Sequence, residues 1–108
     1  MFERERLYKD IFGTISSYSV EGNIANLVLI EDAIEVYKNK SAVAVLKQLF
    51  DSDGVEDGDI ISPAGRDVLL KHQFCVKTIK NKQWGYQTCT YHGAWAIKVI
   101  EWLEANDK

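Results

Sequence analysis

Apolar residues recur every three or four positions along much of this chain, which is the pattern of helices with one buried face. The pattern predicts helices over residues 3–15, 23–37, 41–50, 62–72 and 91–103. The residues expected on their buried faces are Leu7, Tyr8, Ile11, Phe12, Ile15, Ile24, Leu27, Val28, Ala33, Ile34, Tyr37, Ala42, Val45, Leu46, Leu49, Phe50, Val68, Leu69, Ala96, Val99, Ile100 and Leu103.

Hydroxyl residues in front of three of these segments predict where the helices begin. Ser41 can cap the third helix, and Ser62 followed by Pro63 is a strong start signal for the fourth, since proline suits the first helical position. Thr90 can cap the last helix. Each of these side chains can accept a hydrogen bond from a backbone N–H that the helix itself leaves unpaired.

One pattern occurs twice, over residues 61–69 and 89–97. Each copy has a strand-like residue, a hydroxyl residue, a glycine three residues later and apolar residues after it. The repeat predicts that the same strand-to-helix turn is used at Ser62 and at Thr90.

The period of the pattern changes to two between residues 73 and 90, where β-branched and aromatic residues dominate. Residues 80–83 carry the expected reversal, and Trp84, Tyr86 and Thr88 continue on the return strand. We therefore predict an α+β fold of four to five helices, with one C-terminal two-stranded β-hairpin packed between helices.

Length and composition favour one ordinary globular domain spanning residues 1–108. The chain has 108 residues, 46% hydrophobic and 27% charged, and it contains no apolar run long enough to cross a membrane. The N-terminal residues are charged where a secretion signal would be apolar. We expect a cytoplasmic protein whose two cysteines are reduced thiols.

Charge is distributed unevenly along the chain. The net charge is −3, but residues 66–98 contain six basic residues and one acidic residue, Asp67, so this segment carries +5 and the remainder −8. The acidic residues are densest over residues 51–59. Such asymmetry indicates either a polyanionic or acidic partner for the basic segment, or two segments that complement each other within the fold.

The order of elements resembles a winged-helix domain with a C-terminal extension. A helix at 41–50, a short extended piece at 60–61, a helix at 62–72, a hairpin at 73–90 and a closing helix at 91–104 carry this resemblance, preceded by N-terminal helices over residues 1–40. It implies a nucleic-acid-binding regulator whose reading helix and wing bear Arg66, Lys71, Lys77, Lys80 and Lys82. The turn between the two helices departs from the pattern, because it is long and its carboxylates would repel a phosphate backbone.

Three tryptophans, Trp84, Trp95 and Trp102, suggest a second kind of site. Trp95 and Trp102 are seven residues apart, so they share one side of the last helix at the edge of its core face. Tryptophans in such positions anchor protein interfaces, or they wrap a hairpin onto helices. Both interpretations stay open from the sequence.

Both histidines and both cysteines lie within 21 residues, as His72, Cys75, Cys89 and His92. They are placed symmetrically about Lys82, so the two cysteines and the two histidines are each directly opposed across the hairpin if its turn is centred there. Two cysteines and two histidines suit tetrahedral zinc, although residues three apart on a strand point to opposite faces. The alternative is two core cysteines and two surface histidines. The acidic segment also resembles the start of a calcium-binding EF-hand loop, but it lacks the closing glutamate, so a solvated loop is favoured.

The sequence contains no recognisable catalytic motif, and we predict no enzymatic activity. The favoured function is binding of another protein, as in immunity proteins, antitoxins and inhibitors of the small bacterial or phage type. The alternatives are a winged-helix nucleic-acid-binding regulator and a zinc-stabilised interaction module. No cofactor is expected apart from this zinc alternative, no membrane association is expected, and homo-oligomerisation stays open.

Overall fold

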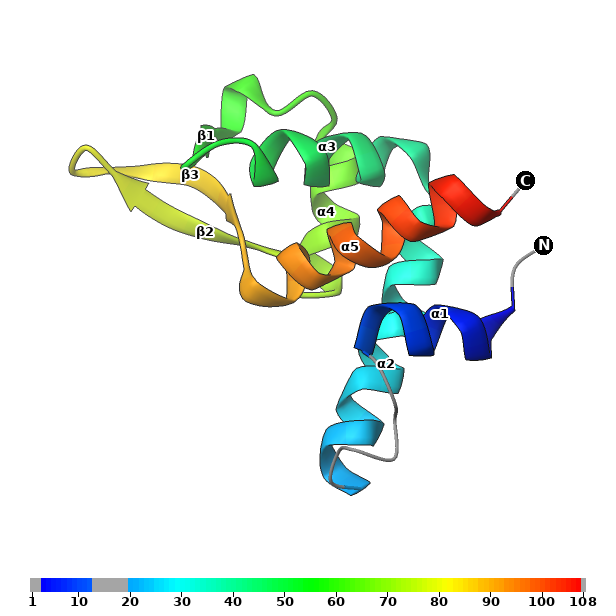
Figure 1. Ribbon diagram of the computed structural model, residues 1–108. Coiled ribbons are helices and arrows are strands. Elements are labelled where there is room, and N and C mark those ends of the chain that lie inside the picture. The colour runs from blue at the N-terminus through cyan, green and yellow to red at the C-terminus, as the bar shows by residue number, and fades with distance from the viewer. Residues whose placement is uncertain (1–2, 13–19, 108) are drawn as a thin grey trace.

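The computed structural model describes residues 3–12 and 20–107, without the side chains of residues 4, 12 and 20–27. Its helices are α1 (Arg4–Phe12), α2 (Val20–Tyr37), α3 (Lys40–Phe50), α4 (Pro63–Lys71) and α5 (Tyr91–Asn106), with a short 3-10 helix η2 (Asp57–Asp59). Its strands are β1 (Val55–Glu56), β2 (Cys75–Lys80) and β3 (Gln83–Cys89). The predicted α+β class is confirmed. Figure 1 shows the β2–β3 hairpin projecting from one side of the helical part and the first half of α2 extending beyond the other helices.

The core lies between the helices and the base of the hairpin. It contains Leu7, Ile30, Ala33, Ile34, Val36, Ala42, Val45, Leu46, Leu49, Ile60, Leu69, Phe74, Cys75, Ala96, Ile97, Val99, Ile100 and Leu103. These include most of the predicted buried faces. Tyr8, Ile11, Tyr37 and Val68 are partly buried and pack against this core. Phe50 and Val28 are about half exposed, Phe50 at the last residue of α3, where the chain turns toward β1. The predicted positions Phe12, Ile15, Ile24 and Leu27 lie outside the described side chains.

Two of the three predicted helix caps are confirmed. The Gly65 N–H donates to Ser62 Oγ and the Gly93 N–H donates to Thr90 Oγ1, each at 3.0 Å. The third prediction is wrong: α3 is capped by Asn39, whose Oδ1 accepts from the Ala42 N–H at 3.1 Å. Asn39 has the extended backbone that a cap needs, so the helix begins ahead of Ser41.

Gly65 and Gly93 show why the same turn is used twice. A Cβ atom at Gly65 would lie 2.5 Å from the carbonyl oxygen of Ser41, and one at Gly93 would overlap the carbonyl oxygen of Phe74. Each glycine thus lets the first turn of a helix press directly against the backbone of another segment. The hydroxyl cap sets where the helix begins, and the glycine sets how closely it packs.

The sheet has three antiparallel strands in the order β1-β3-β2, where the sequence predicted two. The added strand comes from the acidic segment, with Val55 opposite Gln87 and Glu56 opposite Tyr86. The predicted extended piece at residues 60–61 is wrong in part, because Ile60 has extended backbone but belongs to no strand. A two-residue strand is too short to show alternation, which is why the pattern missed it.

The hairpin reverses where predicted. Asn81 and Lys82 have φ angles of 53° and 66°, the left-handed pair that a two-residue hairpin turn requires. The register runs from Cys75 opposite Cys89 to Lys80 opposite Gln83, with an irregularity beside Gly85, whose φ is 112°. No helix among residues 3–12 and 20–107 has the length and apolar character to cross a membrane.

We expect Gly93→Ala to destabilise the fold by about 2 kcal/mol, because the added methyl group has no room beside the Phe74 carbonyl. Urea unfolding measures the change as a lower midpoint at an unchanged slope. Gly58→Ala is the matched control, since no atom lies within 4 Å of its Cβ position. Equal midpoints for the two variants would contradict the close packing at Gly93.

Candidate functional site

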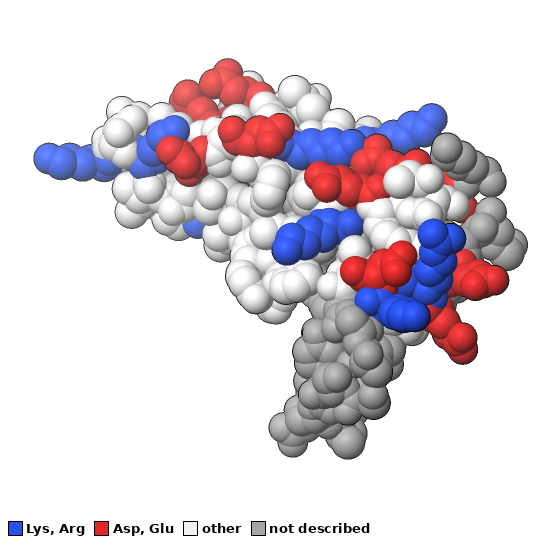
Figure 2. All heavy atoms as spheres, in the orientation of Figure 1, with Lys and Arg blue, Asp and Glu red and all other residues white. Residues whose placement is uncertain are grey.

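The acidic segment folds against the basic segment, and Asp57 is the point of contact. Its carboxylate lies 3.7 Å from Arg66 Nη1 and 3.5 Å from Lys77 Nζ. The same carboxylate accepts a hydrogen bond from Gln87 Nε2 at 3.2 Å. One side chain of η2 therefore joins α4, β2 and β3. Acidic and basic residues lie next to one another at the hairpin side of the molecule in Figure 2.

Arg66, expected on a reading helix, is held inward. Its side chain is 24% exposed and pairs with Asp67 as well as Asp57, at 3.2 Å from the Asp67 Oδ1. Lys71 is exposed in the last turn of α4. The sequence left two interpretations of the charge asymmetry, and at Arg66 and Lys77 the structure shows complementarity within the chain.

Lys80 and Lys82 differ from the other bases of the hairpin. Lys80 Nζ donates to the Gly54 carbonyl oxygen at 3.3 Å and lies 5.9 Å from the ring centre of Tyr86. Lys82 is exposed in the turn. Neither lysine pairs with a carboxylate among the described residues. The far end of the hairpin consequently keeps its positive charge.

An exposed apolar pair lies at the same end of the hairpin. Ile79 and Trp84 are direct cross-strand partners, and their exposed fractions are 60% and 63%. Lys77 Nζ lies 6.0 Å from the Trp84 ring centre, so this lysine borders the pair. Trp84 was predicted as a binding residue and Ile79 was not. The signal for Ile79 was its position across the expected turn from Trp84.

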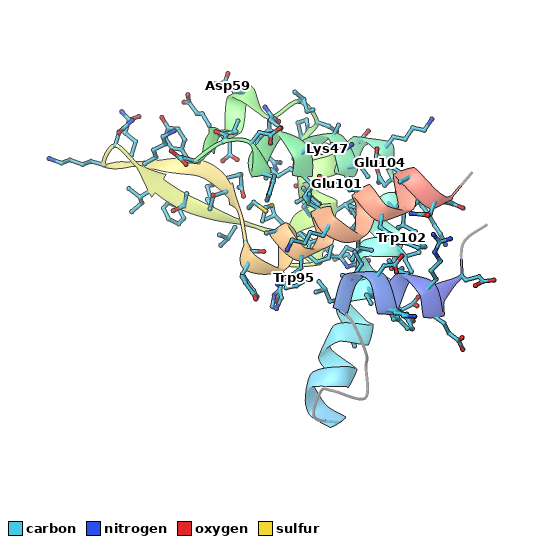
Figure 3. The ribbon with its side chains drawn as sticks, viewed as in Figure 1. Lys47, Asp59, Trp95, Glu101, Trp102 and Glu104 are labelled. Carbon is cyan, nitrogen blue, oxygen red and sulfur yellow. The ribbon has the colours of Figure 1, made fainter. Side chains whose placement is uncertain are left out.

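Trp95 and Trp102 hold different positions on α5 (Figure 3). Trp102 packs against the core, and its Nε1–H donates to Asp10 Oδ2 of α1 at 2.8 Å. Trp95 is half-buried, and its ring centre lies 4.4 Å from Lys98 Nζ. Its ring packs edge-on against the Tyr91 ring. Trp102 therefore joins α5 to α1 and does not wrap the hairpin onto the helices, while Trp84 alone of the three is mostly exposed.

The four cysteine and histidine residues fall into two pairs. Cys75 and Cys89 are directly opposed in the ladder, as their symmetric spacing predicted, and both are free thiols. Among the described residues, no three His, Cys, Asp or Glu side chains converge closely enough to hold a metal ion. The four residues do not form one zinc donor set, and the acidic segment does not form a calcium site in this structure.

Both histidines line a pocket of about 310 Å³ between α2, the corner before β2 and the start of α5. His72 Nδ1 lies 3.4 Å from Asp32 Oδ1, and its ring stacks on Phe74. Residues 72 and 92 thus come together at one end of the hairpin, but the side chain of His72 is directed toward α2. Its contact with Asp32 links α2 to the corner between α4 and β2.

The two thiols lie in an environment that keeps them protonated. Burial, followed by the neighbouring Cys89, raises the pKa of Cys75 to about 11. Burial also raises the pKa of Cys89. Since the thiolate is the reactive form, neither cysteine has the character of an activated nucleophile.

No protein-family model, curated protein or solved structure matches this chain. The winged-helix resemblance therefore depends on element order alone.

Asp57→Asn should lower the free energy of unfolding by about 1 kcal/mol, because it removes the charge shared by Arg66 and Lys77. Added salt should reduce this difference, since it screens the lost attraction. Asp59→Asn is the control, because it removes an equal charge from an exposed side chain two residues further along the chain. Identical urea midpoints for the two variants would show that Asp57 does not hold these segments together.

Alkylation by iodoacetamide should be roughly a hundredfold slower at Cys75 in the folded chain than in urea at pH 8, because its pKa is raised by about two units. The folded-state rate should rise as the pH increases from 9 toward 11. Mass spectrometry of the digested chain measures each cysteine separately. Equal rates in the folded and unfolded chains would contradict the buried, protonated state of Cys75.

Proposed function

We propose that this chain acts by binding another protein through the projecting end of its β-hairpin, without enzymatic activity. The observation that carries the proposal is the exposed Ile79–Trp84 pair, which Lys77 borders. Tryptophan is typical of the residues that dominate binding energy in protein interfaces. We call Ile79, Lys80, Lys82 and Trp84 the hairpin tip.

Nucleic-acid binding is the second candidate. The sheet order β1-β3-β2 and the helix α4 that leads into the β2–β3 hairpin support it, because they resemble the reading helix and wing of a winged-helix domain. Phosphate binding depends on cations that can reach the backbone. Arg66 and Lys77 instead share Asp57 within the chain, and Arg66 is mostly buried. This internal compensation favours a protein partner over nucleic acid.

The class we favour comprises small proteins that neutralise or regulate another protein, such as immunity proteins, antitoxins and inhibitors. Such proteins act by covering a partner's surface, so they need a rigid projecting feature rather than a catalytic set. The paired strands and the left-handed Asn81–Lys82 turn give the hairpin tip that rigidity.

The test is affinity capture from the native host with the wild-type chain and with Trp84→Ala and Ile79→Ala. Each variant should weaken capture of the same partner by about tenfold or more, since hot-spot residues contribute roughly 2 kcal/mol each. Tyr91→Ala and Ile61→Ala are the matched controls, with exposed fractions of 75% and 61% on other parts of the chain. These controls should leave capture unchanged.

Two results would contradict the proposal. Capture that is insensitive to both hairpin-tip variants would show that the binding surface lies elsewhere. Binding of the purified chain to mixed-sequence duplex DNA, with an affinity that falls steeply as salt increases, would favour the nucleic-acid candidate instead.

A further inference from the structure

Strand β2 lies at the edge of the sheet, because the strand order is β1-β3-β2. Its one strand partner among the described residues is β3. Figure 1 shows the outer half of the hairpin extending beyond the helices. An open edge of this kind presents unpaired backbone N–H and C=O groups to which another extended chain can bind.

The ladder identifies which backbone groups point outward. The Thr90 N–H donates to the Phe74 carbonyl oxygen at 3.1 Å, so the residue pair 74/90 is a hydrogen-bonded pair. Since the pattern alternates, residues 76 and 78 also direct their backbone groups toward β3. Lys77 and Ile79 therefore direct theirs toward the open edge.

Charge indicates what can bind there. Residues 68–98 contain no acidic residue. Strand β2 carries Lys77, which also contacts Asp57, and Lys80, with Lys82 in the adjoining turn. Lysines on an edge strand disfavour pairing with a like-charged strand, which includes β2 of a second copy. A strand that carries carboxylates is favoured instead, because a carboxylate placed opposite a lysine is attracted to it.

We propose that an extended, carboxylate-bearing segment of a partner protein adds to β2 as a fourth strand, with an apolar side chain placed against Ile79 and Trp84. Main-chain hydrogen bonds to Lys77 and Ile79 supply affinity, and the lysines and the apolar pair select the sequence. The open part of β2, residues 76–80, accommodates about five residues of such a strand. This inference rests on the proposed protein-binding function and specifies the chemistry of the partner.

A nine-residue peptide that alternates glutamate with valine, acetylated and amidated at its ends, serves as the probe. Amide exchange measured by NMR should slow at least about tenfold at Lys77 and Ile79 when the peptide is saturating, because these two N–H groups become hydrogen-bonded. A peptide that alternates lysine with valine is the charge control and should cause no protection.

Backbone methylation separates strand addition from simple charge attraction. Two versions of the acidic peptide carry N-methyl groups on alternate residues, one on the even and one on the odd positions. Only one version should retain binding, since methylation of the peptide edge that faces β2 removes its donors and leaves every charge in place. Equal binding by both versions would overturn the inference.

Variants of the chain provide a second readout. Lys77→Pro removes an outward N–H without breaking the β2–β3 ladder, and Lys77→Ala removes the same charge but keeps the N–H. The proline variant should bind the acidic peptide about three- to tenfold more weakly than the alanine variant, the effect of one lost backbone hydrogen bond. If the proline variant fails to fold, the methylated peptides decide the question alone.

The outcomes distinguish this inference from the proposed function. Protection of Lys77 and Ile79 that depends on peptide methylation supports strand addition. No binding, or binding without protection of these amides, overturns it and leaves the proposed function standing if Trp84→Ala still reduces capture. Duplex DNA that protects the same amides and displaces the peptide would overturn both.

Discussion

The hydrogen bonds of Thr90 join the hairpin to α5. Its N–H donates to the Phe74 carbonyl oxygen, and its hydroxyl donates to the Gln73 carbonyl oxygen at 2.7 Å. Its Oγ1 also accepts a hydrogen bond from the Gly93 N–H. Gly93 then presses against Phe74 where a side chain would not fit. The start of β2, the end of β3 and the start of α5 therefore meet at fixed geometry. The direction in which the hairpin leaves the helices depends on this junction.

The hairpin in turn determines which acidic and basic residues of the chain contact one another. Pairing of β1 with β3 brings the acidic segment beside the basic one, and Asp57 binds Arg66, Lys77 and Gln87 together. The carboxylate stabilises the contact between α4 and the sheet, and it also lowers the positive potential over α4. On the hairpin, Lys80 and Lys82 are the lysines that pair with no carboxylate among the described residues, although Lys80 Nζ donates to the Gly54 carbonyl oxygen of the acidic segment.

The far end of the hairpin thus combines three features. It is basic, it carries the exposed Ile79–Trp84 pair, and β2 forms an open strand edge. By contrast, Trp102 is used within the fold, bonded to Asp10 of α1, and Cys75 is buried in the core. The tryptophans and cysteines are therefore divided between residues that pack within the fold and residues at the surface.

The pattern of residues along the chain was enough to predict the helices, the caps at Ser62 and Thr90 and the hairpin turn, because each depends on neighbours a few residues away. The opposition of Cys75 and Cys89 then follows from the position of the turn between them. The pattern did not determine β1, the Asn39 cap in place of Ser41, or the exposure of Phe50. Nor did it show that Asp57 compensates Arg66 and Lys77, or that the two histidines and two cysteines form separate pairs. Those features were decided by the tertiary structure, because they depend on which distant segments the packing brings together, and neither charge nor residue type carries that information along the chain.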